Sequence, residues 1–110
     1  RVKLVEEAVA GISGVSVKSF NGLLVDFAKK EKAVAILRGL RAVSDFDAEF
    51  QLALMNRKLN SSIESVFIMT RGMYAYLSSS IVKEAARLGS KLDGMVPQHV
   101  EDALKGKFKG

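Results

Sequence analysis

The sequence contains no cysteine and only one histidine, His99, among its 110 residues. Without cysteine the chain forms no disulfide and offers no thiolate to a metal ion. A single histidine likewise excludes a metal site built from several imidazole ligands. His99 falls in the first turn of the last helix that the pattern predicts, so we expect it to be a surface residue. The composition therefore predicts no resident metal site.

No apolar run approaches the roughly 18 residues that a membrane-spanning helix requires, and no segment resembles a signal peptide. We therefore expect no membrane contact and a cytoplasmic location. The hydrophobic content of 48% and the charged content of 26% are ordinary for a folded domain. Because 110 residues suffice for one hydrophobic core, we interpret residues 1–110 as a single domain.

The net charge of +5 comes from 17 basic and 12 acidic residues. Part of the basic excess lies in Lys105, Lys107 and Lys109, a cluster that is typical of a solvated tail. No basic stripe alternates with aromatic residues, as it does on many nucleic-acid-binding surfaces. The sequence therefore predicts no nucleic-acid binding, and its basic balance also suits a small polyanionic ligand.

Helical and extended patterns alternate along the chain. They predict helices over residues 2–11, 23–30, 44–59, 81–88 and 98–104, and strands over residues 15–20, 33–37 and 63–69. Ser44 with Asp47 resembles a capping box, while Gly89 and Pro97 mark a helix end and a helix start. Alternating strands and helices predict an α/β fold with a Rossmann-like parallel sheet flanked by helices. A sheet of three strands has exposed edges, so we expect further strands upstream of Arg1.

The most informative segment is Arg38-Gly39-Leu40-Arg41, directly behind the short β-branched run of residues 33–37. Such a run suits a strand buried on both faces of a parallel sheet, and open α/β sheets bind ligands at the carboxyl ends of their strands. Arginine pairs two-to-two with phosphate oxygens, and glycine lets a backbone N–H approach an anion closely. The segment therefore predicts a phosphate site, and a solvated strand-to-helix turn is the alternative.

A second feature that favours anions follows the third predicted strand. Ser78, Ser79 and Ser80 begin a helix after a loop centred on Gly72, and helix N-termini bind anions. A capping role explains one of these serines without a ligand. Because the serines and the two arginines are predicted at the same edge of the sheet, together they strengthen the prediction of a phosphate ligand.

The acidic and aromatic residues near these segments have simpler explanations beside the functional ones. Asp45 and Glu49 lie one turn apart near a helix start, where the helix dipole favours carboxylates. Ion pairs with Arg38 or Arg41 explain them equally, and their spacing alone favours either explanation over a ligand role. Two tyrosines in the loop before the serines, Tyr74 and Tyr76, could stack on a base or pack in the core.

Taken together, these segments resemble the bacterial phosphopantetheine adenylyltransferases of the nucleotidyltransferase superfamily. The block R-G-L-R-x-x-x-D-F-x-x-E, from Arg38 to Glu49, is quite specific to that family, whereas the serine motif is shared across the superfamily. The resemblance also uses residues 51–57, 64–67 and 78–84, and it extends over essentially the whole chain. It implies a parallel sheet of the nucleotidyltransferase type.

The resemblance implies transfer of the adenylyl group from ATP to 4′-phosphopantetheine, which gives dephospho-coenzyme A and pyrophosphate. The acceptor phosphate attacks the α-phosphorus directly, Mg²⁺ accompanies the ATP, coenzyme A is a possible product-type ligand, and the assembly is a homohexamer. The implied ATP contacts are Gly39, Leu40, Arg41, Glu49, Tyr74, Ala75, Tyr76, Leu77, Ser78, Ser79 and Ser80. Arg41, Ser79 and Ser80 would stabilise the triphosphate, and Leu24 and Arg38 would contact the pantetheine substrate.

One family motif has no match in the chain. The family carries Thr/His-x-Gly-His in an N-terminal strand-to-helix turn, and its histidine stabilises the transition state. We therefore expect these 110 residues to be the C-terminal two-thirds of an adenylyltransferase domain and to be inactive alone. The alternatives are another nucleotidyltransferase of the superfamily with a different phosphorylated acceptor, or a truncated nucleotide-binding module without turnover.

Overall fold

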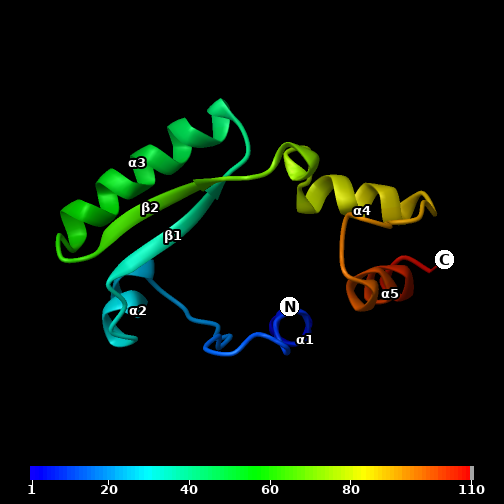
Figure 1. Ribbon diagram of the computed structural model, residues 1–110, viewed down its shortest axis with the longest axis horizontal. Helices are drawn as coiled ribbons and strands as arrows, with labels where there is room; N and C mark the ends of the chain where they lie inside the picture. Colours follow the sequence, from blue (N-terminus) through cyan, green and yellow to red (C-terminus); the bar gives the residue numbers. More distant parts are fainter. Residues whose placement is uncertain (110) are drawn as a thin grey trace. The chain divides into compact units, whose positions relative to one another are not determined.

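The computed structural model describes residues 1–109, without the side chains of Val43 and Ser44 (Figure 1). The chain forms two compact units. One unit comprises residues 20–76, and the other combines residues 1–19 with the chain from Leu77 onward. Each unit is described by itself below.

The unit of residues 20–76 is built around two parallel strands, β1 (Ala35–Leu40) and β2 (Glu64–Met69). Their register pairs Ala35 with Glu64 and Leu40 with Met69. The connection between them is helix α3 (Val43–Leu59), which lies along one face of the strands (Figure 1). A shorter helix, α2 (Leu24–Lys30), precedes β1. This strand–helix–strand order confirms the predicted parallel α/β arrangement.

Aromatic rings attach α3 to the sheet. Phe46 stacks on Phe50 within the helix at a centroid distance of 5.5 Å and meets Phe67 of β2 edge-on at 6.3 Å. Ile63, just before β2, is buried. Aromatic pairs in these geometries add to the free energy gained by burying their surface. They hold the first turns of α3 next to the carboxyl-terminal half of the strands.

The predicted strand over residues 15–20 is wrong, because the described part of this segment has no strand structure. A strand requires a neighbour whose N–H and C=O groups pair with its own, and β1 and β2 pair with each other. Phe20 instead stacks on Phe27 of α2 at 4.4 Å. The alternation of side chains over residues 15–20 predicted a strand, but this pattern carries no information about which strand would pair with it.

The bounds and the burial of β1 also differ from the prediction. The strand continues to Leu40 instead of ending at Leu37, because its backbone pairs with β2 as far as Met69. On the face opposite α3, Leu37 is 64% exposed and Ile68 is 55% exposed. The prediction of a strand buried on both faces is therefore wrong for the described residues.

The second unit contains three helices, α1 (Val2–Ala8), α4 (Ser79–Arg87) and α5 (Gln98–Lys107). Its core is formed by Val82, Ala86 and the fully buried Leu92. The buried Glu101 of α5 accepts a hydrogen bond from the Leu92 N–H at 3.3 Å and pairs with Lys105 at 2.9 Å. A buried carboxylate is tolerated because both contacts compensate its lost hydration.

The predicted end of α4 is confirmed, and the predicted start of α5 is nearly so. Gly89 has φ of +80° after the end of α4, a conformation that glycine adopts without strain. Pro97 occupies the N-cap position of α5, one residue before the predicted place. The expectation of a surface His99 is wrong, because this residue is partly buried and its Nε2 lies 2.9 Å from the Leu4 carbonyl oxygen of α1.

The start of α3 differs from the predicted capping box. The helix begins at Val43, and Ala42 is its N-cap residue. The side chain of Ser44, on which that prediction depended, lies outside the described residues. None of the helices formed by residues 1–109 has the length and apolar character needed to cross a membrane.

Replacing Leu92 by alanine should lower the free energy of unfolding by about 2–5 kcal/mol, because the change leaves a cavity in a closed core. Leu88→Ala is the matched control, since Leu88 is 77% exposed and should change stability by less than about 0.5 kcal/mol. Urea unfolding of the full-length protein measures both values. Equal losses in the two variants would contradict the assigned core.

Candidate functional site

Arg38 and Glu49 form a two-pronged ion pair between β1 and α3. The Arg38 Nε donates to Glu49 Oε2 at 2.8 Å, and Nη2 donates to Oε1 at 2.6 Å. Arg38 is a residue of β1, whereas the sequence predicted that it follows the strand. Its hydrogen bonds to Glu49 place its side chain on the face of the sheet that α3 covers. Because the pairing is bidentate, it fixes the plane of the guanidinium as well as its position.

Arg41 and Asp45 form a second pair at the junction of β1 and α3. Asp45 Oδ2 accepts from both the backbone N–H and the Nε of Arg41 at 3.1 Å, and Oδ1 lies 3.4 Å from Nη2. Asp45 is the third residue of α3, where a carboxylate accepts from backbone N–H groups at the helix start. One aspartate therefore holds the backbone and the side chain of Arg41 together.

The two pairs shift the titration of their carboxylates in the same direction. The hydrogen bond from Arg38 lowers the pKa of Glu49, and the same bond raises the pKa of Arg38. The pKa of Asp45 is lowered first by the Arg41 guanidinium and then by backbone N–H groups. Both carboxylates are therefore ionised at neutral pH, and Arg38 stays protonated. This outcome confirms the ion-pair interpretation of the two acids.

Gly39 and Leu40 complete the segment between the arginines. Gly39 pairs with Ile68 of β2, and a Cβ added to it would meet only Thr70 Oγ1, at 3.9 Å. Packing within the described residues therefore does not demand glycine at this position. Leu40 is half-buried, and its carbonyl accepts a hydrogen bond from the Thr70 N–H at 2.8 Å. This bond extends the strand pairing beyond β2.

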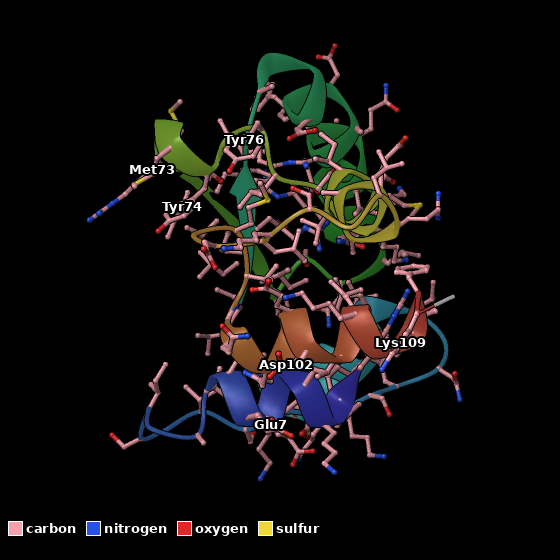
Figure 2. All side chains as sticks on the ribbon, turned by 90° about the vertical axis from the view of Figure 1, so that its right-hand side faces the viewer. Glu7, Met73, Tyr74, Tyr76, Asp102 and Lys109 are labelled. Carbon is pink, nitrogen blue, oxygen red and sulfur yellow. The ribbon has the colours of Figure 1, made fainter. Side chains whose placement is uncertain are left out.

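The tyrosines that follow β2 do not pack in the core. A short 3₁₀ turn, η1 (Gly72–Tyr74), places Tyr74 42% exposed, and Tyr76 is 51% exposed. Figure 2 shows Met73 and Tyr74 pointing outward from this turn. The core-packing alternative is therefore wrong for both tyrosines, and their ring faces remain accessible. Ala75 is half-buried between them, and Leu24 is half-buried at the start of α2.

Of the three serines, Ser78 has a structural role, whereas Ser79 and Ser80 are exposed. The Ser78 hydroxyl caps α4 by accepting from the Ile81 N–H at 3.2 Å. Ser79 and Ser80 are exposed in the first turn, where backbone N–H groups lack partners within a helix. A largely apolar groove of about 410 Å³ begins beside Ser79 and is lined by Leu77, Ser78, Ser79, Val82, Lys83, Met95, Val96, Val100 and Leu104.

The residues of the predicted site are divided between the two units, and the structure brings residues together only within each unit. Arg38, Arg41 and Glu49 belong to the unit of residues 20–76, whereas Leu77 and the serines belong to the other unit. The prediction that the arginines and the serines surround one phosphate group stays a prediction.

Sequence reasoning gave no role to two residues that border these parts. Asn56 of α3 is 7% exposed and lines a small recess with Arg38 and Glu49. Lys83 borders the groove four residues after Ser79. The signal for both was helical spacing: Asn56 falls seven residues, about two turns, after Glu49, and Lys83 falls one turn after Ser79.

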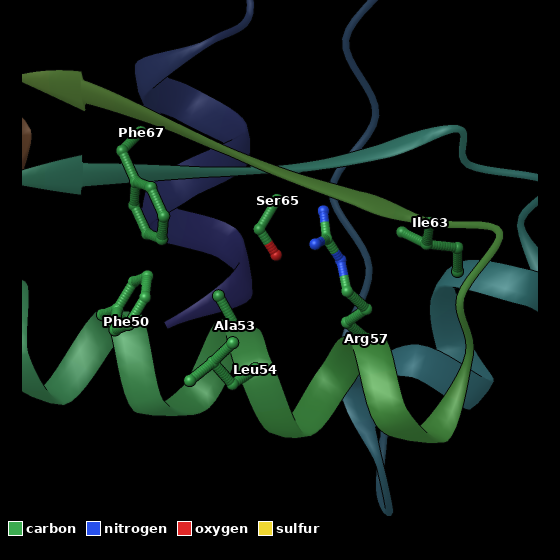
Figure 3. A pocket seen from close by; sticks show the side chains of 7 residues that line it. All are labelled: Phe50, Ala53, Leu54, Arg57, Ile63, Ser65 and Phe67. Carbon is green, nitrogen blue, oxygen red and sulfur yellow. The ribbon is translucent and has the colours of Figure 1, made fainter.

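A separate cavity of about 190 Å³ lies between α3 and β2 (Figure 3). Phe50, Ala53 and Phe67 line it together with Arg57, which pairs with Glu64 at 3.1 Å. Ligand pockets usually span about 300–1,000 Å³, so we interpret this space as incomplete packing. Within the described range, no three histidine or carboxylate side chains gather as a metal ion would require.

The carboxylate of Glu49 should titrate below the ordinary range of glutamate in a carbon-13 NMR experiment. Arg38→Met should raise its midpoint, because the hydrogen bond that lowers the pKa is lost. The contribution of the pair to stability is present above the ordinary carboxyl pKa of about 4.3 and disappears as the pH falls through the lowered pKa. An unchanged midpoint in Arg38→Met would contradict the pairing.

Ser78→Ala should lower the free energy of unfolding by about 1 kcal/mol, since the start of α4 loses its side-chain cap. Ser78→Asp is the matched control, because aspartate caps helices as well as serine does. Chemical denaturation of the full-length variants gives both values. If the aspartate variant lost as much stability as the alanine variant, capping would not be the role of Ser78.

Comparisons with known proteins identify the family of the chain. Residues 1–85 match the family model described as cytidylyltransferase-like. Over 108 residues the chain is 56% identical to the phosphopantetheine adenylyltransferase of Moorella thermoacetica and 54% identical to that of Desulfosudis oleivorans. It is 51% identical over 109 residues to the same enzyme of Desulfatibacillum aliphaticivorans.

These alignments cover 98%, 98% and 99% of the chain, but 68%, 64% and 62% of the respective relatives. The chain thus spans about two thirds of the length of the curated relatives that it matches. The identity over nearly the whole chain and the family-model match lead to one conclusion: the chain belongs to the cytidylyltransferase-like family and, within it, to the phosphopantetheine adenylyltransferases.

Proposed function

We propose that the protein containing this chain transfers the adenylyl group of ATP to 4′-phosphopantetheine. The products are dephospho-coenzyme A and pyrophosphate. The observation that carries the proposal is the pair of arginines, Arg38 and Arg41, held by two carboxylates at the carboxyl end of β1. Close similarity to curated enzymes of that name supports the choice of substrates.

The reaction joins two polyanions, so charge repulsion is its main obstacle. An oxygen of the acceptor phosphate forms a bond to the α-phosphorus, while the bond from that phosphorus to the bridging oxygen breaks and pyrophosphate leaves. Such a transfer needs positioning and charge stabilisation more than a side-chain nucleophile. Guanidinium groups and helix N–H groups that are already oriented supply this stabilisation without reorganising during the reaction.

We assign a role to individual residues of each unit in turn. Arg38 and Leu24 would hold the pantetheine substrate, and Arg41 would stabilise the triphosphate. The exposed first turn of α4 at Ser79 and Ser80 would contribute hydroxyl and N–H donors to the same phosphates. The resemblance further implies ATP contacts by Gly39, Leu40, Glu49, Tyr74, Ala75, Tyr76, Leu77 and Ser78.

The tyrosine rings and the groove beside α4 suit the nucleotide chemically. Tyr74 and Tyr76 are exposed, so a ring face is accessible for stacking on a base. The groove combines apolar walls with polar groups at Ser78, Ser79 and Lys83, a combination that is common in ligand sites. Mg²⁺ would arrive with the ATP phosphates as part of the substrate.

The remaining parts of the proposal concern the whole protein. It would act in the cytoplasm as a homohexamer, and coenzyme A would bind as a product-type ligand. The expectation that the 110-residue chain alone has no turnover is tested by assaying it beside the full-length protein. Robust turnover by the purified chain would contradict this expectation.

Arg41→Ala in the full-length protein should reduce kcat/KM by about 30- to 900-fold, which corresponds to about 2–4 kcal/mol of transition-state stabilisation. The reason is the loss of a donor already oriented toward the phosphates. Pyrophosphate release from ATP and 4′-phosphopantetheine measures the rate. Arg57→Ala is the control, because Arg57 is an exposed arginine of α3 that pairs with Glu64. An unchanged kcat/KM in Arg41→Ala would contradict the role of Arg41.

A further inference from the structure

The dipeptide Asn21-Gly22 lies in the connection that precedes α2. Both residues are exposed and belong to no helix or strand, and Gly22 has φ of +98°, a conformation that glycine adopts without strain. Within residues 1–109, no hydrogen bond holds the Asn21 side chain or the Gly22 N–H. The side-chain amide of Asn21 and the backbone nitrogen that follows it are therefore accessible, and no bond must break before they meet.

A glycine after asparagine leaves its backbone nitrogen open to an intramolecular reaction, which benefits from proximity. A Cβ at Gly22 would meet no atom within 4 Å, so packing does not shield this nitrogen. The nitrogen can form a bond to Cγ of Asn21, lose its proton to water and expel the side-chain nitrogen as ammonia, which closes a succinimide ring. Water then opens the ring at either carbonyl and leaves aspartate or isoaspartate, each with a new carboxylate.

The two other asparagines of the chain lack this combination of features. Asn56 is 7% exposed inside α3 and precedes Arg57, whose N–H lies in the helix interior. The Oδ1 of Asn60 accepts hydrogen bonds from the Ser62 N–H at 3.1 Å and from the Ser62 hydroxyl at 2.6 Å. Ring closure at Asn60 would have to break both bonds first. The structure therefore favours ring closure at Asn21.

Isoaspartate lengthens the main chain by one carbon atom, here in a connection that is fixed at both ends. On one side, the Phe20 ring stacks on Phe27 of α2 at 4.4 Å, with 7° between the ring planes. On the other side, α2 begins at Leu24, and the next residue, Val25, is 2% exposed. Because close packing holds the buried side of α2 in place, the extra atom displaces the residues between Phe20 and Val25, which include Leu24.

We propose that Asn21 is a site of spontaneous modification in the folded protein, where conversion to isoaspartate weakens the acceptor side of the site. The modification needs only water besides the chain itself. Its effect on activity rests on the proposed function, in which Leu24 contacts 4′-phosphopantetheine. The ATP contacts implied for Arg41, Ser79 and Ser80 lie on other elements, so the modification leaves them in place.

Mass spectrometry of the full-length protein tests the modification. Native protein is incubated at neutral and at mildly alkaline pH, digested with trypsin and compared with an unincubated sample. The peptide of residues 19–29 should first lose the mass of one ammonia and then gain the mass of one water. Its isoaspartate form should also accept a methyl group from an isoaspartate methyltransferase. The rate should rise with pH, because the attacking nitrogen must lose its proton.

Asn21→Gln is the matched control, because its longer side chain closes a larger ring much more slowly. Its peptide should keep its mass throughout the incubation, as should the wild-type segments that contain Asn56 and Asn60. Gly22→Ala is less suitable, since a side chain at φ of +98° strains the backbone. If Asn21 stays intact in the native protein, or reacts only after unfolding in urea, the proposal is overturned.

Enzyme kinetics test the effect on the acceptor. Incubated wild-type protein with isoaspartate at residue 21 should have a KM for 4′-phosphopantetheine raised about tenfold, the loss expected for one apolar contact. Its KM for ATP should stay within about twofold of the value for fresh protein. Asn21→Gln incubated alongside should keep both values, and Asn21→Asp, which adds the charge without the extra carbon, should match fresh wild type. An unchanged acceptor KM in the isoaspartate form, or an equal rise in Asn21→Gln, would overturn the displacement of Leu24.

The two measurements separate this inference from the proposed function. If fresh wild-type protein transfers no adenylyl group, the proposed function fails, whereas the mass of the peptide still decides whether Asn21 reacts. If adenylyl transfer is normal and Asn21 keeps its mass, the modification fails and the proposed function stands.

Discussion

The short connection between β1 and α3 determines the geometry of the arginine part of the site. Only Arg41 and Ala42 separate the end of the strand from the start of the helix. The helix therefore begins beside the carboxyl end of the strand, and its carboxylates at the third and seventh positions are within reach of Arg41 and Arg38. A longer loop would separate the acids from the arginines without changing either element.

The same junction reconciles two requirements that conflict electrostatically. A site for two polyanionic substrates needs positive charge, yet adjacent uncompensated guanidinium groups repel each other. The paired acids remove this repulsion and hold the plane of each guanidinium in a fixed direction. Under the proposed function, the site would attract phosphate through oriented N–H groups, and its attraction would depend less on a net excess of charge. Lysine could not replace either arginine, because it has no planar fork that a carboxylate can hold.

Residue patterns predicted those parts of the structure that depend on neighbours in the sequence. Helical spacing located α2 and α4, and Gly89 located the end of α4, because the signals lie within one or two turns. The segment 15–20 shows the limit, since a strand depends on a partner that is distant in the sequence. The end of β1 was misplaced for a similar reason: Arg38 and Gly39 have no strand pattern of their own, and pairing with Phe67 and Ile68 extends the strand over them.

The side-chain alternation along β1 explains why the site and the exposed apolar surface occupy opposite faces of one short strand. Arg38 projects toward α3, whereas its neighbour Leu37 projects to the other face and is largely exposed. Because the period of a strand is two residues, a slip of one residue would turn Arg38 away from Glu49 and bring Leu37 beneath the helix. The contacts of Phe46 with Phe67 oppose such a slip, since they fix α3 against β2 at the level of Arg38. Aromatic packing and charge pairing therefore select the same register, and the position of the Arg38 guanidinium depends on both.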